Sequence, residues 1–292
     1  MTSVGFIGLG HMGLPMALNL LKKGYQVVGY DISTESKAAF VAQGGKVVDD
    51  LESLAGNKDV MITMLQTPEQ VLQVCLGDQG IFKRMQVGAL YMDCSTIGVE
   101  TICKLHEAAK LHGLLSLEAP VSGGVRGAVF GSLTLMVGGD ESLFEAYQPL
   151  LSCLGTTVIH TGGAGSGQAA KLCNNMLLGI SMIAVSEAFL LAERLGLSHQ
   201  KLHDVVTQSS GQCWSMSVHA PVPHVVPQSP ANDDYQPGFS TKMMLKDLRL
   251  GQQAAAAVGF TTTLGALATE IYTKKGQEIA DLDFSAIITC MP

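Results

Sequence analysis

The stretch Val4-Gly-Phe-Ile-Gly8-Leu-Gly10-His-Met-Gly13 decides the fold of the first half of the chain. Its apolar start predicts a short buried strand, and residues 14–24 predict a helix that ends at a glycine. A second strand is expected over residues 25–30. This is a βαβ unit with GxGxxG at its turn, where successive glycines permit a tight turn, approach of a pyrophosphate, and close helix packing. We therefore expect a dinucleotide to bind at the turn, on Gly8, Leu9, Gly10, His11, Met12 and Gly13.

An acidic residue, Asp31, closes the second strand about 20 residues after the glycines, as the dinucleotide motif requires. A carboxylate there accepts hydrogen bonds from both ribose hydroxyls and repels a 2′-phosphate, which favours NAD over NADP. The alternative is that Asp31 only caps the turn before Ser33 and Thr34.

The α/β pattern continues to about residue 162. Buried strands are expected over 59–65, 89–93 and 115–118, with helices between them. Ligands of doubly wound sheets bind outside the carboxyl ends of the strands, which places Leu65, Gln66 and Thr96 where a cofactor would lie. The same residues also fit ordinary turns at strand ends.

A serine and two glycines, Ser122, Gly123 and Gly124, follow the end of the strand at 115–118. Exposed N–H groups in such a loop form a nest that suits a carboxylate or a phosphate. The alternative is a glycine-rich connector to a strand at 133–137.

The strand pattern stops after Gly163, and helices are expected over 167–195, 198–209, 242–258 and 264–275. The sequence thus predicts an α/β protein: a doubly wound, Rossmann-type sheet domain (1–163), then an all-α domain (164–292), joined by a long interdomain helix. Ser166 is the expected N-cap of that helix. The proline-rich loop at 220–234 has the length of a lid, and the single Trp214 fits a buried anchor better than a pocket wall.

The long helix carries Lys171 and Asn175 on one face among apolar residues. One interpretation is a solvated first turn whose lysine reaches water; the other is a pair of residues that performs chemistry. Lys246 and Asp247, taken alone, fit a solvated helix face.

Composition excludes several classes of function. The net charge of −7 without a basic run argues against nucleic acid as a partner. The seven cysteines show no CxxC spacing, so we expect neither a metal site nor disulfides, and a reducing cytoplasm fits. A strand from Val4 leaves no room for a targeting peptide. The apolar run at 176–192 is interrupted by Glu187 and fits a core helix better than a membrane span. Its apolarity suggests a homodimer or homotetramer.

Four blocks in order resemble the motifs of the β-hydroxyacid dehydrogenase family: Gly8–Gly13 with Pro15–Asn19, Asp93–Ile97, Ala119–Gly124 and Gly165–Asn175, with Lys246-Asp-Leu as a fifth. Residues 209–215, 220–223 and 232–239 resemble its 3-hydroxyisobutyrate dehydrogenase branch. The sequence departs from that branch at Gln66, where proline is usual, and at Gln70, where asparagine is frequent.

The resemblance implies a role for each matching residue. Lys171 would be the catalytic acid/base. Ser122, Gly123 and Gly124 would hold the substrate carboxylate, and Asn175 would position the hydroxyl end. Leu65, Gln66, Gln70 and Thr96 would contact NAD, and Lys246 would reach the cofactor or the substrate.

The implied reaction is oxidation of a small 3-hydroxy acid, 3-hydroxyisobutyrate, to methylmalonate semialdehyde with NAD, a step of valine breakdown. A lysine acting as base at neutral pH needs its pKa lowered from about 10.4, and burial beside a positive nicotinamide ring would lower it. The alternatives are a related reductase of tartronate or succinic semialdehyde, and a non-catalytic NAD-binding protein.

Overall fold

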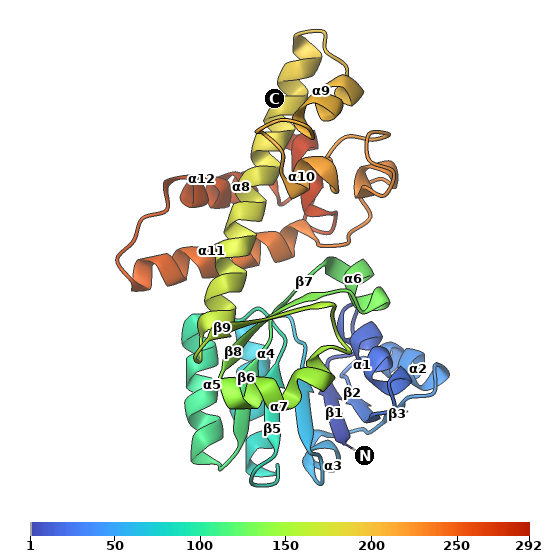
Figure 1. Cartoon of the computed structure of the whole chain (residues 1–292), viewed down its shortest axis with the longest axis vertical. Helices are drawn as coiled ribbons and strands as arrows, with labels where there is room; N and C mark the ends of the chain where they lie inside the picture. The colour runs from blue at the N-terminus through green and yellow to red at the C-terminus, as the bar shows by residue number, and fades with distance from the viewer. Residues whose placement is uncertain (1) are drawn as a thin grey trace. The chain divides into compact units, whose positions relative to one another are not determined.

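The computed structural model describes residues 2–292 (Figure 1). The chain divides into two compact units, Met1–Lys171 and Leu172–Pro292. The boundary lies within helix α8 (Ser166–Arg194), which begins in the first unit and continues through the second.

A nine-stranded sheet organises the first unit, in the order β3-β2-β1-β4-β5-β6-β8-β7, with β9 paired to β8. The strands from β3 to β6 pair in parallel, β8 runs antiparallel to β6 and β7, and β9 is parallel to β8. The strands are β1 (Ser3–Ile7), β2 (Gln26–Tyr30), β3 (Lys46–Val47), β4 (Val60–Thr63), β5 (Leu90–Asp93), β6 (Leu115–Glu118), β7 (Val121–Ser122), β8 (Thr134–Gly139) and β9 (Thr157–Gly162).

Helices cover both faces of this sheet. They are α1 (Gly13–Lys22), α2 (Thr34–Ala42), α3 (Leu51–Ala55), α4 (Pro68–Leu76), the 3-10 turn η1 (Ile81–Lys83), α5 (Val99–Leu111), α6 (Gly124–Phe130) and α7 (Glu141–Leu151). Side chains alternate between two apolar clusters: Ile62 and Met92 join α1, α2, α6 and α7, whereas Met61 and Tyr91 join α3, α4 and α5. This alternation is the period of two that a strand buried on both faces requires. The predicted Rossmann-type sheet is confirmed.

The second unit is helical. After α8 it contains α9 (His199–Val206), α10 (Trp214–Ser217), η2 (Pro230–Asn232), α11 (Thr241–Ala257), α12 (Thr263–Lys275) and η3 (Phe284–Cys290). Met182 of α8 packs with Met244 of α11 and Tyr272 of α12 in one cluster, and Phe189 of α8 lies in another. Among residues 2–292, α8 alone is long and apolar enough to cross a membrane by length and composition. Because its side chains belong to both apolar clusters of the second unit, α8 has the environment of a core helix.

Several local predictions were wrong. The alternative of a glycine-rich connector does not hold for residues 124–130, which form the short helix α6, and the helix α3 was not foreseen. Trp214 is 47% exposed and stacks on His219, so it is not a buried anchor. In the 220–234 segment, Ser229 Oγ donates to the Ala220 carbonyl, and Tyr235 Oη just after it donates to the Pro221 carbonyl. Its role as a lid stays a prediction.

Candidate active site

The glycine turn between β1 and α1 has the geometry that a dinucleotide needs. Gly8 has φ of +95°, and a Cβ on Gly13 would lie 1.8 Å from the Gly8 carbonyl oxygen. A Cβ on Gly10 would meet no atom within 4 Å, so the backbone there is open to a ligand. No side chain caps the first N–H groups of α1, and its first turn holds no acidic residue. These groups and the helix dipole suit a pyrophosphate.

Asp31 lies beside this turn. Its Oδ2 accepts a hydrogen bond from Leu9 N at 2.6 Å and its Oδ1 accepts one from Ser33 N at 2.8 Å. Asp31 therefore caps its own turn and holds the glycine turn as well. Each carboxylate oxygen can accept a second hydrogen bond, so the capping role leaves room for ribose hydroxyls.

The loops after β4 and β5 are bonded to each other. Leu65 N donates to Ser95 Oγ at 2.9 Å, which in turn donates to Asp93 Oδ1 at 2.8 Å. The exposed Gln70 accepts the backbone N–H of Gln66 at 3.0 Å through Oε1. Gln70 thus holds the loop itself, and Leu65 and Thr96 are half-buried at neighbouring strand ends.

The predicted anion loop lies between β7 and α6. Ser122 ends β7, Gly123 has φ of +131°, and Gly124 begins α6 with φ of +62°. A side chain at either glycine would be strained, which explains why two glycines stand here. The role in binding a carboxylate stays a prediction.

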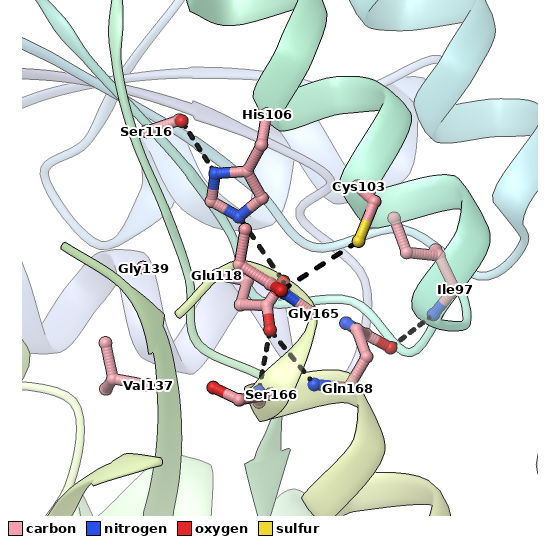
Figure 2. Close-up of polar contacts among 12 residues, drawn as sticks. Ile97, Cys103, His106, Ser116, Glu118, Val137, Gly139, Gly165, Ser166 and Gln168 are labelled. Atoms are coloured by element: carbon pink, nitrogen blue, oxygen red, sulfur yellow. Dashed lines mark hydrogen bonds and ion pairs between the residues drawn. The ribbon is translucent and has the colours of Figure 1, made fainter. Parts of the chain in front are cut away.

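Two residues that the sequence analysis missed, Glu118 and Gln168, hold the first turn of α8 (Figure 2). Glu118, at the end of β6, accepts hydrogen bonds from the backbone N–H groups of Gly165, Gly167 and Gln168. Ser166, the expected N-cap, instead shares a 2.8 Å hydrogen bond with Thr161. A carboxylate from another strand satisfies the free N–H groups, and no local sequence signal announces it.

Lys171 and Asn175 are both buried, with 7% and 1% of their surface exposed. The interpretation of Lys171 as part of a solvated first turn is therefore wrong. Asn175 Nδ2 donates to Asp247 Oδ2 at 2.5 Å, and Lys246 Nζ lies 3.1 Å from Asp247 Oδ1. Asp247, only 2% exposed, thus links Asn175 of α8 with Lys246 of α11, and the expected solvated Lys-Asp face is also wrong.

Among residues 2–292, no group of three or more His, Cys, Asp or Glu side chains is placed to hold a metal ion.

The fold and the glycine turn define an NAD-binding protein. The family model of the NAD-binding domain of 6-phosphogluconate dehydrogenase matches residues 3–162. A second model, described as NAD-binding of NADP-dependent 3-hydroxyisobutyrate dehydrogenase, matches residues 165–291.

Similar proteins of known name place this NAD-binding protein in one family. The chain is 47% identical over 288 residues to a probable 3-hydroxyisobutyrate dehydrogenase of Mycobacterium tuberculosis, covering 99% of this chain and 97% of the relative. It is 43% identical to the human mitochondrial 3-hydroxyisobutyrate dehydrogenase, covering 98% and 85%. The M. tuberculosis 3-hydroxyisobutyrate dehydrogenase structure with L-serine superposes with a TM-score of 0.93 at 46% identity, covering 99% and 98%. The chain belongs to the 3-hydroxyisobutyrate dehydrogenase family.

Proposed function

We propose that this protein oxidises 3-hydroxyisobutyrate to methylmalonate semialdehyde, with NAD as the hydride acceptor. Its relatives at 43–47% identity carry the name of that enzyme over nearly the whole chain. The observation that carries the proposal is the buried pair on α8, a lysine one turn before an asparagine. Bound NAD supplies the chemistry of hydride transfer.

Each predicted residue of the substrate site then has a role. Lys171 removes the proton of the substrate hydroxyl during oxidation and returns it during reduction, a contribution of roughly 10²–10⁴-fold. Ser122, Gly123 and Gly124 bind the substrate carboxylate. The Asn175 amide faces the hydroxyl end in a fixed orientation, because its Nδ2 is bonded to Asp247 and its Oδ1 accepts from Asn174.

NAD is the preferred cofactor under this proposal, because Asp31 would repel a 2′-phosphate. Gly8 to Gly13 bind the pyrophosphate, while Leu65, Gln66, Gln70, Thr96 and Lys246 contact the rest of the cofactor. We further propose that the two domains of the family meet after Gly163, between the two matched family models and eight residues before the compact units divide. We also propose a cytoplasmic location and a homodimer or homotetramer.

Lys171→Ala tests the mechanism. We expect kcat to fall at least 1,000-fold, which lies in the range of rate that general acid–base catalysis contributes. The NADH dissociation constant, measured by fluorescence titration, should stay within twofold of the wild-type value. Lys104→Ala is the control, because this lysine is exposed and pairs with Glu100 one turn away on α5. A Lys171→Ala enzyme that kept a tenth of the activity would refute the assignment.

Initial rates on a panel of hydroxy acids and semialdehydes test the substrate. The proposal expects the highest kcat/KM with 3-hydroxyisobutyrate. A higher value with tartronate or succinic semialdehyde would assign the protein to a related reductase, and no turnover with any of them would leave an NAD-binding protein without this catalysis.

A further inference from the structure

We propose that Gln168 and Glu118 are positioning residues for Lys171: together they lock the first turn of α8 to the ends of β5 and β6, and so fix the lysine relative to the Thr96 loop. The inference deepens the proposed function and rests on it for the role of Lys171. All of its residues belong to the first compact unit.

Gln168 is fully buried, and its carboxamide is bonded on both sides of Thr96. Its Oε1 accepts the backbone N–H groups of Ile97 and Gly98 at 3.0 and 3.1 Å, and its Nε2 donates to the Ser95 carbonyl at 2.8 Å. Gln168 therefore holds this loop through three hydrogen bonds, of which Figure 2 marks the one from Ile97. It stands three residues before Lys171 on α8, so the two side chains share a face of the helix.

Glu118 holds the same turn from the neighbouring strand. Its Oε1 accepts from Gly167 N at 2.7 Å and Gln168 N at 3.2 Å, and its Oε2 accepts from Gly165 N at 3.1 Å. A negative charge at a helix N-terminus is also favourable toward the helix dipole. Behind it, His106 Nε2 lies 3.4 Å from Glu118 Oε2 while His106 Nδ1 bonds Ser116 Oγ at 2.7 Å.

Two glycines leave the space that the carboxylate occupies. A Cβ on Gly138 would lie 2.4 Å from Glu118 Oε1, and one on Gly167 would lie 3.0 Å from the same atom. Burying a carboxylate costs free energy, and a serine cap would suffice merely to start a helix. The arrangement instead ties the helix start to fixed points of the sheet, which a local cap does not do.

The consequence is catalytic. Misplacement of a reacting group by 1 Å costs up to about 100-fold in rate, and Lys171 follows the anchored residue by one turn. Loss of the Gln168 bonds frees both the lysine turn and the Thr96 loop, so proton transfer and cofactor binding weaken together.

Gln168→Met is the principal test, because methionine has similar length and makes none of the three hydrogen bonds. We expect kcat at saturating substrate and NAD to fall 10- to 100-fold, the NADH dissociation constant to rise at least fivefold, and the amides of Ile97 and Gly98 to exchange faster with solvent. Gln200→Met is the matched control, since Gln200 is exposed and its side chain donates to Asp204 one turn along the same helix.

Glu118→Gln is the second test, because an amide turns one acceptor into a donor that faces a backbone N–H. Its matched control is Asp283→Asn in the second unit. Asp283 is also fully buried, accepts backbone N–H groups from Gly238, Phe239 and Ser285, and lies 2.8 Å from a histidine. Both variants should have a lower melting temperature, but only Glu118→Gln should show a kcat reduced at least tenfold.

The outcomes separate the two proposals. A Gln168→Met enzyme with kcat within twofold of wild type, or with unchanged exchange at Ile97 and Gly98, overturns the positioning role. If the wild-type protein does not turn over 3-hydroxyisobutyrate, the proposed function fails. The role of Gln168 in holding the Thr96 loop is then tested by the NADH affinity of Gln168→Met. A fivefold loss of affinity supports that role, and an unchanged affinity overturns it.

Discussion

Asp93, at the end of β5, is a fully buried carboxyl with one oxygen that has no hydrogen-bond partner in the described part of the chain. Burial raises its pKa from 3.8 to about 6, although Thr63 and Ser95 donate to the other oxygen and oppose the rise. Because the folded pKa is above the unfolded one, the stability from the neutral carboxyl is complete below about pH 4. It is lost as pH rises through about 6.

Asp93→Asn removes this titration and keeps an oxygen for both hydroxyl donors. We expect the difference in unfolding free energy, variant minus wild type, to grow by up to about 3 kcal/mol between pH 4 and 7, since each pKa unit is worth about 1.4 kcal/mol. Urea unfolding at several pH values measures it, and other titrating groups largely cancel in the difference. A difference in unfolding free energy that did not change with pH would contradict a raised pKa of the Asp93 carboxyl.

Residues with a local signature could be predicted from the sequence, and residues held by distant partners could not. Asp31 follows a strand and a glycine motif, so its place beside Leu9 was foreseeable, though its role toward a cofactor stays a prediction. The bonds of Glu118 join positions 47 to 50 residues apart, and those of Gln168 span 70 to 73. Nothing near either residue in the sequence indicates these contacts.

At the scale of elements, the turn from β1 to α1 depends on glycine at position 13. A Cβ there would overlap a backbone oxygen at 1.8 Å, and backbone does not give way cheaply. We expect Gly13→Ala to lower the melting temperature and to weaken NADH binding at least tenfold, because α1 must move away from β1.

The control for this substitution is Gly251→Ala. Gly251 lies inside α11, and a Cβ there would meet no atom within 4 Å. Alanine is favoured over glycine in a helix by roughly 1 kcal/mol, so this variant should gain stability and bind NADH as before. If Gly13→Ala bound NADH normally, the turn would not need its third glycine.

Long elements were predictable, and short ones were not. Strands such as β4 and β5 are continuous apolar runs bounded by turns, and α11 and α12 follow the helical period. The helices α3 and α6 have five and seven residues. A helix of one or two turns has little periodicity to detect, and α6 begins at Gly124 among residues typical of a loop.

At the scale of the whole molecule, the order of a sheet domain before a helical one followed from where the strand pattern stops. The compact units divide after Lys171, inside α8, whereas the sequence pattern breaks at Gly163. A helix that belongs to both units hides the division from the sequence, because its period continues without interruption. The placement of Lys171 on this shared helix is what makes the anchoring of its first turn matter.

The second unit leaves leucines exposed along α8 and α12. Leu177 and Leu191 are 64% and 58% exposed, and Leu264 and Leu267 are 60% and 51% exposed. Leu191 and Leu267 line two neighbouring hollows that share Glu187, Met291 and Pro292, so they belong to one surface region. Exposed apolar groups gathered in this way are typical of a surface that binds a partner, and we propose that the partner is another copy of the chain.

We therefore expect light scattering to give two or four times the mass of one chain, and the double variant Leu191→Glu with Leu267→Glu to give a smaller assembly. Its circular dichroism should be unchanged, because both side chains are exposed within the chain. Leu111→Glu is the control: this leucine is 86% exposed at the end of α5, in the first unit, and its charge should leave the mass unaltered. A wild-type monomer, or a double variant of undiminished mass, would show that these leucines do not hold copies together.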